Sequence, residues 1–361
     1  MKLAMLFSPA LFVLVMIETA HAVGEPPQPA KSAPPPLRSQ PRELGTVSWA
    51  RDLDMVLTQA KRKNTPVMVI FTEVPGCKTC VDYGQDVLAH PLIAEAIQAL
   101  FDPVAVFNNA KGPDEEILRA FEEPAMNNPV VRIIDADRKP LAPRIADDFS
   151  PAGIVGAMTT ALKKIGREIP GYVKLLEEET LAKAATPERA VFAMECFWEG
   201  EGRLGALSGV VETRIGTMKG REVVEVTFDP RRVTYETLVK TAMEMKCADH
   251  VFTRTDAQQA VAAKLAKDKA VRTDEEMKPE KEQKHHLFAT PYRFLPMTLI
   301  QASRVNAALA QNQDPALFLS PRQLELFAKI KAKPNARWQA APGTGNMARA
   351  WNAAQRVAVG R

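Results

Sequence analysis

Two hydrophobic periods alternate along the first part of the chain. Apolar residues recur at helical spacing from Leu53 to Ala60, and a continuous apolar run from Val67 to Phe71 then has the composition of a buried strand. The same change of period is repeated downstream, which predicts alternating strands and helices and therefore an α/β domain over residues 45–170. The further elements expected are strands at 104–107 and 128–134 and helices at 87–100, 117–121 and 154–165.

The pattern changes in the second half of the chain. The elements expected there are a strand at 190–194, a helix at 198–207, strands at 210–215 and 222–228, and a helix at 235–245. This β-α-β-β-α order is typical of a split βαβ, ferredoxin-like layer, so an α+β domain is expected to follow the α/β domain. The second domain is assigned to residues 186–335, with a charged helix at 257–284, helices at 299–309 and 320–330, and a Pro/Gly/Ala tail at 336–361.

The N-terminal segment has the pattern of a targeting sequence. Lys2 is followed by an apolar run, Leu3 to Ile17, and by the small-residue site Ala20-His21-Ala22. The rival interpretation is a membrane anchor, but the run is shorter than the roughly 20 residues that a spanning helix needs. We therefore expect a signal peptide over residues 1–22, a proline-rich linker over 23–44, and a periplasmic or secreted protein without stable membrane insertion.

Composition narrows the classes of function. The formal net charge is only +4 over 361 residues and the charges are dispersed, so nucleic acid is not an expected partner. The four cysteines form one close pair, Cys77 and Cys80, and two distant singles, Cys196 and Cys247. This spacing is too sparse for a disulfide-stapled fold and lacks the second short pair of a structural zinc site. No metal ligands and no cofactor are assigned.

The close pair lies where a strand meets a helix. Cys77-Lys78-Thr79-Cys80 follows the buried run at 67–71, so the first thiol is expected at a helix N-terminus, where backbone N–H groups favour a thiolate. The second thiol then lies one turn away and can resolve a mixed disulfide. The pattern favours a redox-active dithiol; a stapling disulfide or a metal clip is the alternative.

A family resemblance supports the first centre. Residues 45–166 resemble a thioredoxin-like domain, and Val74-Pro75-Gly76-Cys77 resembles the VPGU-x-x-T motif of a family of thioredoxin-like proteins, some of them selenoproteins. Cys77 takes the selenocysteine position and Cys80 the threonine position. The resemblance implies disulfide exchange at this pair. It also implies that Pro129, at the start of a strand, packs beside the dithiol with a cis peptide bond and contacts substrate.

The second centre is Cys196-Phe197-Trp198, again between a strand and a helix. Two large aromatic residues beside a thiol are suited to line an apolar pocket for a small thioether. The segment at 191–198 resembles the strand and Gly-Cys-Phe-Trp motif of peptide methionine sulfoxide reductase A, as do residues 209–213 and 222–230, and the match covers about residues 188–265.

This second resemblance implies a set of roles. Cys196 would attack the sulfoxide sulfur, Phe197 and Trp198 would hold the substrate methyl group, and Glu222, kept protonated beside an apolar pocket, would protonate the oxygen. The sulfenic acid left on cysteine must condense with another thiol, for which Cys247 is the candidate. A buried structural cysteine is the alternative for Cys247, since simple topology places it at the other end of the sheet from Cys196.

Three features depart from the reductase pattern. Glu195 stands where the family has glycine, and its negative charge disfavours a neighbouring thiolate. The stretch before Glu222 lacks the tyrosine that helps to bind the sulfoxide oxygen, and the downstream Asn-Asp and Gln-Tyr-Arg pattern is not recovered. The adjacent His285 and His286 are expected in a solvated loop.

The leading hypothesis is an exported thiol oxidoreductase for protein repair. Peptide methionine-(S)-sulfoxide is expected to be reduced at Cys196, with thiol–disulfide exchange through Cys77 and Cys80. One alternative keeps only disulfide exchange and makes the second domain a substrate-binding module. The other is a thiol-based metal-binding or partner-binding envelope protein. The expected partners are oxidised envelope proteins or methionine sulfoxide, and a thiol electron donor that the sequence does not identify.

Overall fold

The computed structural model describes residues 40–126, 129–245, 247–343 and 345–360. The expected signal peptide at 1–22 and most of the expected linker at 23–44 lie outside the described residues. Among the described residues, no helix has both the length and the apolar character needed to cross a membrane.

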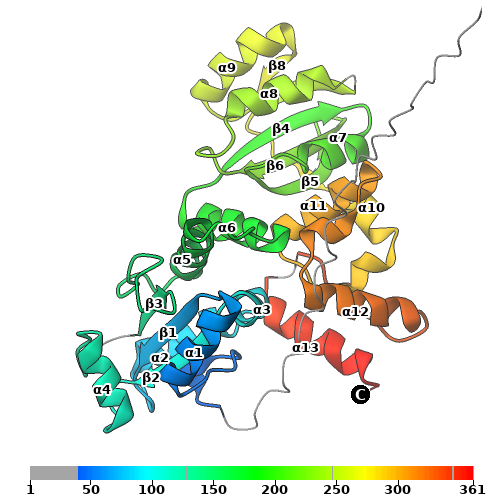
Figure 1. The fold of residues 1–361 in the computed structure, drawn as a ribbon. Coiled ribbons are helices and arrows are strands. Elements are labelled where there is room, and N and C mark those ends of the chain that lie inside the picture. Colours follow the sequence, from blue (N-terminus) through cyan, green and yellow to red (C-terminus); the bar gives the residue numbers. More distant parts are fainter. Residues whose placement is uncertain (1–39, 127–128, 246, 344, 361) are drawn as a thin grey trace, which may run out of the picture. The chain divides into compact units, whose positions relative to one another are not determined.

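The first domain is built on a three-stranded sheet in the described part of the chain (Figure 1). Its strands are β1 (Val67–Thr72), β2 (Asp102–Phe107) and β3 (Val130–Ile134), in the order β2-β1-β3. The central strand β1 pairs parallel with β2 and antiparallel with β3. Every residue of β1 is buried, which explains why its sequence is a continuous apolar run. The expected α/β domain is confirmed.

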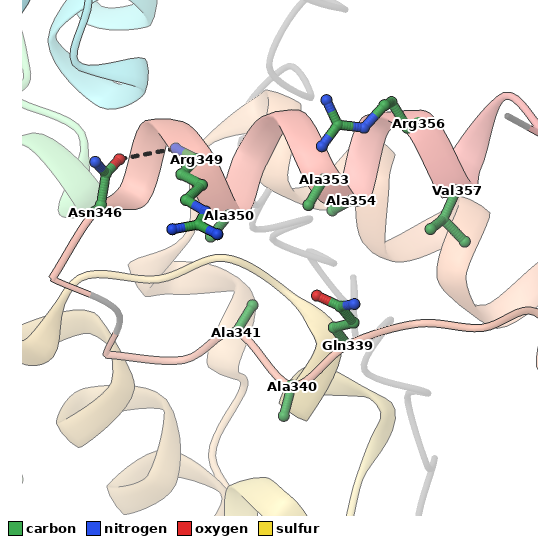
Figure 2. A pocket seen from close by; sticks show the side chains of 10 residues that line it. All are labelled: Gln339, Ala340, Ala341, Asn346, Arg349, Ala350, Ala353, Ala354, Arg356 and Val357. Carbon is green, nitrogen blue, oxygen red and sulfur yellow. Dashed lines mark hydrogen bonds between the residues drawn. The ribbon is translucent and has the colours of Figure 1, made fainter.

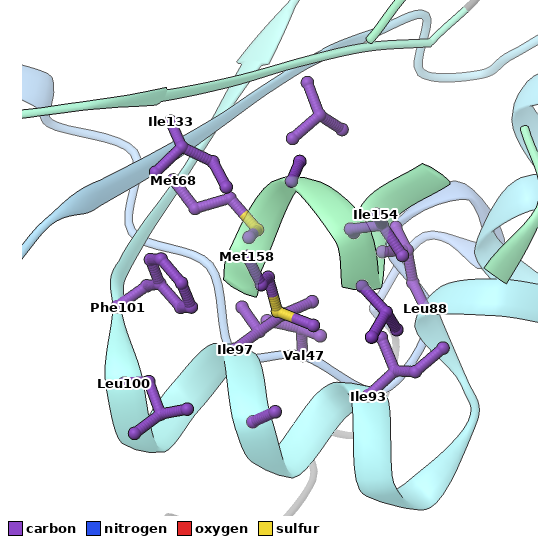
Figure 3. Close-up of a cluster of buried hydrophobic side chains, with 14 of the residues drawn as sticks. Val47, Met68, Leu88, Ile93, Ile97, Leu100, Phe101, Ile133, Ile154 and Met158 are labelled. Atoms are coloured by element: carbon purple, nitrogen blue, oxygen red, sulfur yellow. The ribbon is translucent and has the colours of Figure 1, made fainter. Parts of the chain in front are cut away.

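Helices cover both faces of this sheet and make two cores. Met68 and Ile70 point into one cluster with residues of α3 and α5 (Figure 3). Val69 and Phe71 point the other way, into a cluster with residues of α1, as the period of two along a strand requires. The helices of this domain are η1 (Arg42–Leu44), α1 (Leu53–Lys63), α2 (Lys78–Asp82), the π-helix η2 (Tyr83–Leu88), α3 (Pro91–Leu100), α4 (Pro113–Ala120) and α5 (Pro151–Lys164).

The first domain begins slightly earlier than the expected boundary at residue 45. Gln40 Nε2 donates hydrogen bonds to the carbonyl oxygens of Leu44, Gly45 and Val47, and η1 follows directly. The side chain of Glu43 in η1 is 6% exposed. Residues 40–44 are therefore part of the folded domain, because their polar groups are used inside it.

The second domain contains a six-stranded sheet in the described residues, with the order β8-β7-β4-β6-β5-β9. The four central strands, β7-β4-β6-β5, are antiparallel neighbours. This is the order of a split βαβ layer, as the sequence predicted. The strands are β4 (Glu188–Met194), β5 (Val210–Met218), β6 (Arg221–Phe228), β7 (Ala248–Thr253), β8 (Ala270–Arg272) and β9 (Lys278–Pro279).

Two sequence predictions for this half of the chain are wrong. The charged helix expected at 257–284 ends at Ala266, because Lys267 adopts a φ of 54°, and strands β8 and β9 occupy part of the remainder. The expected tail contains a helix, α13. The helices of this half are α7 (Phe197–Leu204), α8 (Tyr235–Glu244), α9 (Asp256–Ala266), η3 (Lys267–Lys269), α10 (His285–Phe288), η4 (Pro291–Phe294), α11 (Leu299–Ala310), η5 (Pro315–Phe318), α12 (Pro321–Ala332) and α13 (Met347–Ala358).

Helix α6 (Gly171–Ala184) contacts the elements of both halves of the chain. Val173 and Leu176 belong to the core of the first domain. Glu178 accepts a hydrogen bond from Arg304 Nη2 at 3.2 Å, and Glu179 accepts one from the Ile300 backbone N–H at 3.1 Å. Residues 171–185, which the sequence assigned to neither domain, therefore connect the two cores.

Candidate functional site

The first thiol pair has the expected place between a strand and a helix. Cys77 is the N-cap of α2, and Cys80 lies in the first turn of that helix. The two Sγ atoms are 3.3 Å apart. Cys77 is exposed, whereas Cys80 is 1% exposed. The outer sulfur can therefore meet a partner disulfide, and the inner sulfur is within reach of the mixed disulfide that results.

The surroundings of this pair shift the pKa values of the two thiols in opposite directions. Partial burial acts to raise the pKa of Cys77, but hydrogen bonds from the Cys80 backbone N–H, the Cys80 thiol and the Thr79 backbone N–H outweigh it, and the pKa is lowered. Burial raises the pKa of Cys80. The exposed cysteine is thus the better thiolate and the buried one is held as a thiol, which is the division of roles that disulfide exchange needs.

The loop before Cys77 is held by residues that carried no sequence signal. The Gly76 backbone N–H donates to Glu43 Oε1 at 2.6 Å. Asn109 Oδ1 accepts from the Val74 backbone N–H at 3.1 Å, and Asn109 Nδ2 donates to the Pro75 carbonyl at 3.3 Å. Because these bonds cross from segments distant in the sequence, only the folded chain reveals that Glu43 and Asn109 support the thiol loop.

Gly76 is required by space. A Cβ atom there would lie 2.5 Å from the Glu73 carbonyl oxygen and 2.7 Å from the Cys80 Cβ.

The same tight turn brings a carboxylate oxygen of Glu73 and the sulfurs of Cys77 and Cys80 within 4.8 Å of one another. Two sulfurs and an oxygen at this spacing are also a donor set that Zn²⁺ accepts.

Pro129 lies beside the motif at the edge of the same sheet. Val130 pairs with Phe71, so the preceding Pro129 is next to the end of β1 that leads to the thiol loop, and it is buried. Its peptide bond involves residue 128, so the expected cis bond lies outside the described residues. The cis peptide bond that the described structure does contain is Val74–Pro75, within the motif itself.

The second centre repeats the placement of a cysteine before a helix. Strand β4 ends at Met194, and Cys196 is the N-cap of α7. Cys196 is half-buried. Helix α7 lies tightly against the sheet at Gly200, where a Cβ atom would be 3.0 Å from Met194 Cγ and 3.1 Å from Val224 Cγ2. The sequence prediction of a thiol at a helix N-terminus is confirmed.

The two aromatic residues after Cys196 have different environments. Phe197 is 8% exposed and packs in the core of the second domain. Trp198 is 36% exposed and lines a pocket of about 550 Å³ together with Cys196. The other residues that line this pocket are Glu199, Arg203, His285, His286, Ala310 and Gln311. Of the expected aromatic pair, therefore, Trp198 faces the pocket and Phe197 supports it from inside.

Glu222 is brought to the start of α7 but is not in an apolar environment. Its Oε2 accepts a hydrogen bond from the Phe197 backbone N–H at 3.1 Å. The side chain is exposed, and it is not among the residues that line the Cys196 pocket. A carboxylate at this place complements the positive end of the helix dipole. Its predicted role assumed a place beside an apolar pocket, which this exposed position does not provide.

Cys247 lies on the same edge of the sheet as Cys196. Strands β4 and β7 are antiparallel, so the end of β4 meets the start of β7, and the Glu195 backbone N–H donates to the Cys247 carbonyl at 2.7 Å. The prediction that Cys247 lies at the other end of the sheet from Cys196 is wrong for this reason. Burial raises the pKa of the Cys247 thiol, and the charges of Glu199 and Cys196 add to the effect.

A buried polar network behind the pocket was not anticipated. Lys284 Nζ donates to Glu201 Oε1 at 3.0 Å and to Thr213 Oγ1 at 3.2 Å, and Asn306 Nδ2 donates to Glu201 Oε2 at 3.3 Å. Glu201 on α7 is fully buried. Lys284 and Glu201 are 83 positions apart, so no local pattern in the sequence marks them as partners.

A second hollow, of about 620 Å³, lies between α13 and residues 339–341. Figure 2 shows its wall of alanines and the arginines Arg349 and Arg356 that α13 contributes. None of the described residues that line it is a cysteine or a histidine. It therefore adds nothing to the thiol chemistry.

Comparison with known proteins supports both halves of this description. Residues 48–136 match the family model described as thioredoxin-like. Peptide methionine sulfoxide reductase MsrA 2 of Rhizobium meliloti (strain 1021) is 42% identical over 73 residues, which are 16% of this chain and 37% of that protein. The MsrA of Methanococcus maripaludis (strain C7 / ATCC BAA-1331) is 29% identical over 112 residues, covering 22% of this chain and 71% of that protein.

A solved structure of a DsbH oxidoreductase covers 37% of this chain and 95% of its own length, with 22% identity and a TM-score of 0.28. The chain spans 37% of the length of the first reductase relative and 43% of the length of another, from Geobacter metallireducens (strain ATCC 53774 / DSM 7210 / GS-15). The matched family model is thioredoxin-like in general, so the narrower VPGU-x-x-T resemblance stays a prediction. The chain thus combines a thioredoxin-like domain with a region homologous to peptide methionine sulfoxide reductase A.

Proposed function

We propose that this protein is an exported thiol oxidoreductase that reduces peptide methionine-(S)-sulfoxide at Cys196 and exchanges disulfides at Cys77 and Cys80. The observation that carries the proposal is the position of Cys196. It occupies the N-cap position of helix α7 and lines, together with Trp198, a pocket of about 550 Å³. A thiol at a helix N-terminus beside an indole face offers both a nucleophile and a surface for a thioether methyl group.

The reaction transfers two electrons from sulfur to sulfur. The Cys196 thiolate attacks the sulfoxide sulfur, the substrate sulfur–oxygen bond breaks with uptake of one proton, and methionine leaves, with the oxygen ending on Cys196 as a sulfenic acid. The thiol of Cys247 then attacks Cys196 sulfur, water leaves, and a disulfide joins the two cysteines. Two further electrons, from an external thiol, restore the dithiol.

The first domain supplies the exchange of electrons between thiols and disulfides. Cys77, with its lowered pKa, attacks a disulfide, and Cys80, 3.3 Å away, displaces the partner. The partner disulfide is in an oxidised envelope protein or in the Cys196–Cys247 pair, and an external thiol donor reduces the Cys77–Cys80 disulfide. The N-terminal sequence pattern supports action in the periplasm or outside the cell.

The test is turnover of a peptide that contains methionine-(S)-sulfoxide, with dithiothreitol as reductant. The wild-type protein should produce methionine, and Cys196→Ser should not, because serine cannot accept the oxygen. Cys80→Ser is the matched control, since it removes a thiol without touching the reductase pocket and should leave this turnover intact. A wild type without turnover, or a Cys196→Ser variant as active as the wild type, contradicts the proposal.

A second candidate function is disulfide exchange alone, with the second domain as a binding module. The exposure of Glu222 favours it, because the acid lies outside the apolar environment that its predicted role requires. In this case insulin reduction would depend on Cys77, and the sulfoxide peptide would bind without being reduced. The turnover assay above distinguishes the two functions.

A further inference from the structure

The Cys196 pocket has a polar side formed by two adjacent histidines on helix α10. The ring of His285 stacks on the indole of Trp198, with centroids 4.1 Å apart and planes at 15°. The ring of His286 meets that of His285 edge-on, with centroids 5.4 Å apart. Both histidines line the pocket and both are half-buried. The prediction of a solvated loop at these positions is wrong, because both residues lie in helix α10, His285 packs on Trp198 and His286 packs on His285.

The chain holds the two histidines firmly against the helix that carries Cys196. Lys284, directly before them, adopts a φ of 53° and donates from its side chain to the buried Glu201 on α7. Leu287, directly after them, donates its backbone N–H to Asn306 Oδ1 on α11 at 3.0 Å. Helix α10 is therefore anchored on both sides of the histidine pair, so the rings keep a defined position beside Trp198.

Sulfoxide reduction needs a proton donor that faces the pocket. Glu222 is bonded to the Phe197 backbone and does not line the pocket, and no tyrosine is among the described residues that do. Arg203 lines it, but a guanidinium does not release its proton, and it pairs with Glu199 at 3.4 Å. The amide of Gln311 can donate a hydrogen bond but cannot transfer a proton. The carboxylate of Glu199 also lines the pocket, but it is the acceptor in that ion pair with Arg203. The imidazoles are the lining groups whose ordinary pKa, about 6.5, lies near neutral pH.

We propose that the His285–His286 pair binds the sulfoxide oxygen and donates the proton that Cys196 chemistry requires. The proposal rests on the reductase function proposed above. As the Cys196 thiolate attacks, an imidazolium passes its proton to the oxygen. The substrate sulfur–oxygen bond breaks, the Cys196 sulfur–oxygen bond forms, and the products are methionine, the Cys196 sulfenic acid and a neutral imidazole. Substrate sulfur gains two electrons and Cys196 sulfur loses two.

The electrostatic surroundings of His286 define the expected pH dependence. Burial lowers the pKa of His286, the charge of His285 lowers it further, and Glu201 and the Trp198 backbone oppose the shift. The charged and titratable groups around the pocket are Cys196 at the N-cap of α7, Glu199, Glu201 and Arg203 on α7, Cys247 before β7, and Lys284 and His285 next to His286 in the chain. Ala310, the lining residue on α11, carries no charge. The imidazolium of His286 is therefore lost as pH rises through a pKa below the ordinary histidine value of about 6.5, so the ratio of wild-type kcat/KM to that of the double glutamine variant H285Q/H286Q should fall over that range.

The experiment measures kcat/KM for a methionine-(S)-sulfoxide peptide from about pH 5 to about pH 9, since imidazole titrates in that range. The variants are H285A/H286A, H285Q/H286Q and each single glutamine substitution, compared with the wild type and Cys196→Ser. The double alanine variant should lose about 100-fold, the typical contribution of a positioned acid. The double glutamine variant should recover part of this loss, because an amide still donates a hydrogen bond. Its pH profile of kcat/KM should lack the change that the titration of imidazole causes in the wild type.

The outcomes separate the inference from the function on which it rests. If the wild type is active through Cys196 but all histidine variants stay within about threefold of it with an unchanged pH profile, the histidine proposal is overturned and the proposed function stands. If the wild type shows no turnover, or if the Cys196→Ser variant is as active as the wild type, both the histidine proposal and the proposed function are overturned. The glutamine variants keep a polar side chain of similar size, so a loss of activity in them is not explained by misfolding. Melting temperatures equal to that of the wild type check this directly.

Discussion

The two thiol centres share a local design and differ in how much of the chain each one needs. In both, a cysteine follows a strand of the core and occupies the N-cap position of a helix. At the first centre the second sulfur is three positions later and 3.3 Å away. At the second centre the candidate resolving cysteine, Cys247, arrives with a different strand, β7. A dithiol can therefore be encoded in four residues, whereas a thiol with a shaped pocket requires the topology of the whole sheet.

The centres also differ in the charges around them. Hydrogen bonds from α2 and Cys80 lower the pKa of Cys77. The start of α7 instead holds the Glu222 carboxylate, with the exposed Glu195 and Glu199 as near neighbours in the sequence. The first centre is arranged for attack on disulfides by an exposed thiolate. The second gives its cysteine a pocket lined by Trp198 on one side and by His285 and His286 on the other, which is the feature used by the proposed reductase function.

The most severe test of this division is a reciprocal pair of substitutions. Cys196→Ser should reduce sulfoxide turnover by on the order of 1,000-fold or more, because the nucleophile is lost, and leave insulin reduction unchanged. Cys77→Ser should abolish insulin reduction and leave dithiothreitol-supported sulfoxide turnover unchanged. The two assays are run on the same full-length preparations. If either substitution removes both activities, the centres are not separate in the way described.

A smaller effect is expected at the candidate resolving thiol. Cys247→Ser should allow one round of reduction and then leave Cys196 as a sulfenic acid, lowering steady-state turnover by roughly 100-fold with a protein thiol donor. A sulfenic-acid trap followed by mass spectrometry measures the product on Cys196. Cys80→Ser serves as the control and should give no such trapping on Cys196. Full activity of Cys247→Ser would assign the cysteine a structural role.

The long-range dependence of the second centre predicts a stability effect. Lys284→Met leaves Glu201 buried without its cation, which should lower the free energy of unfolding by roughly 3–5 kcal/mol, measured by denaturant titration. Adding Glu201→Gln should restore part of the loss, since the buried charge is then removed. The exposed Lys78 beside the first centre is the matched control, and Lys78→Met should leave stability unchanged within error. Equal losses at the two lysines would contradict the difference between the centres.

The subtlest expected effect is on the titration of Cys77. Its alkylation rate should rise with pH through a pKa below the ordinary cysteine value and then level off, because the thiolate is the reactive form. Cys80→Ser replaces the thiol that donates to Cys77 and removes the coupled titration, so the midpoint should move measurably. Iodoacetamide labelling followed by mass spectrometry resolves Cys77 from the other cysteines. A midpoint at or above the ordinary value in the wild type would contradict the assigned thiolate.

Local signals account for the parts of the fold that the sequence predicted well. The run at 67–71 is buried along its whole length as β1, so its apolar character alone was sufficient to identify it. The β-α-β-β-α pattern also predicted the ferredoxin-like class of the second domain and its strands β4, β5 and β6, but not β7, β8 and β9. The helix expected at 257–284 failed because charged residues fit a solvated helix and an irregular edge equally well, and Lys267 turns the chain.

The amino-acid sequence by itself determined that a thiol stands at each strand–helix junction, because residue order and helix geometry are local properties. It also determined the spacing of Cys77 and Cys80 within one helical turn. Only the tertiary structure decided that Glu222 is exposed, that Cys247 lies beside the end of β4, and that His285 covers Trp198. These facts depend on strand pairing and on the buried Lys284–Glu201 contact, whose partners meet only when the whole domain folds.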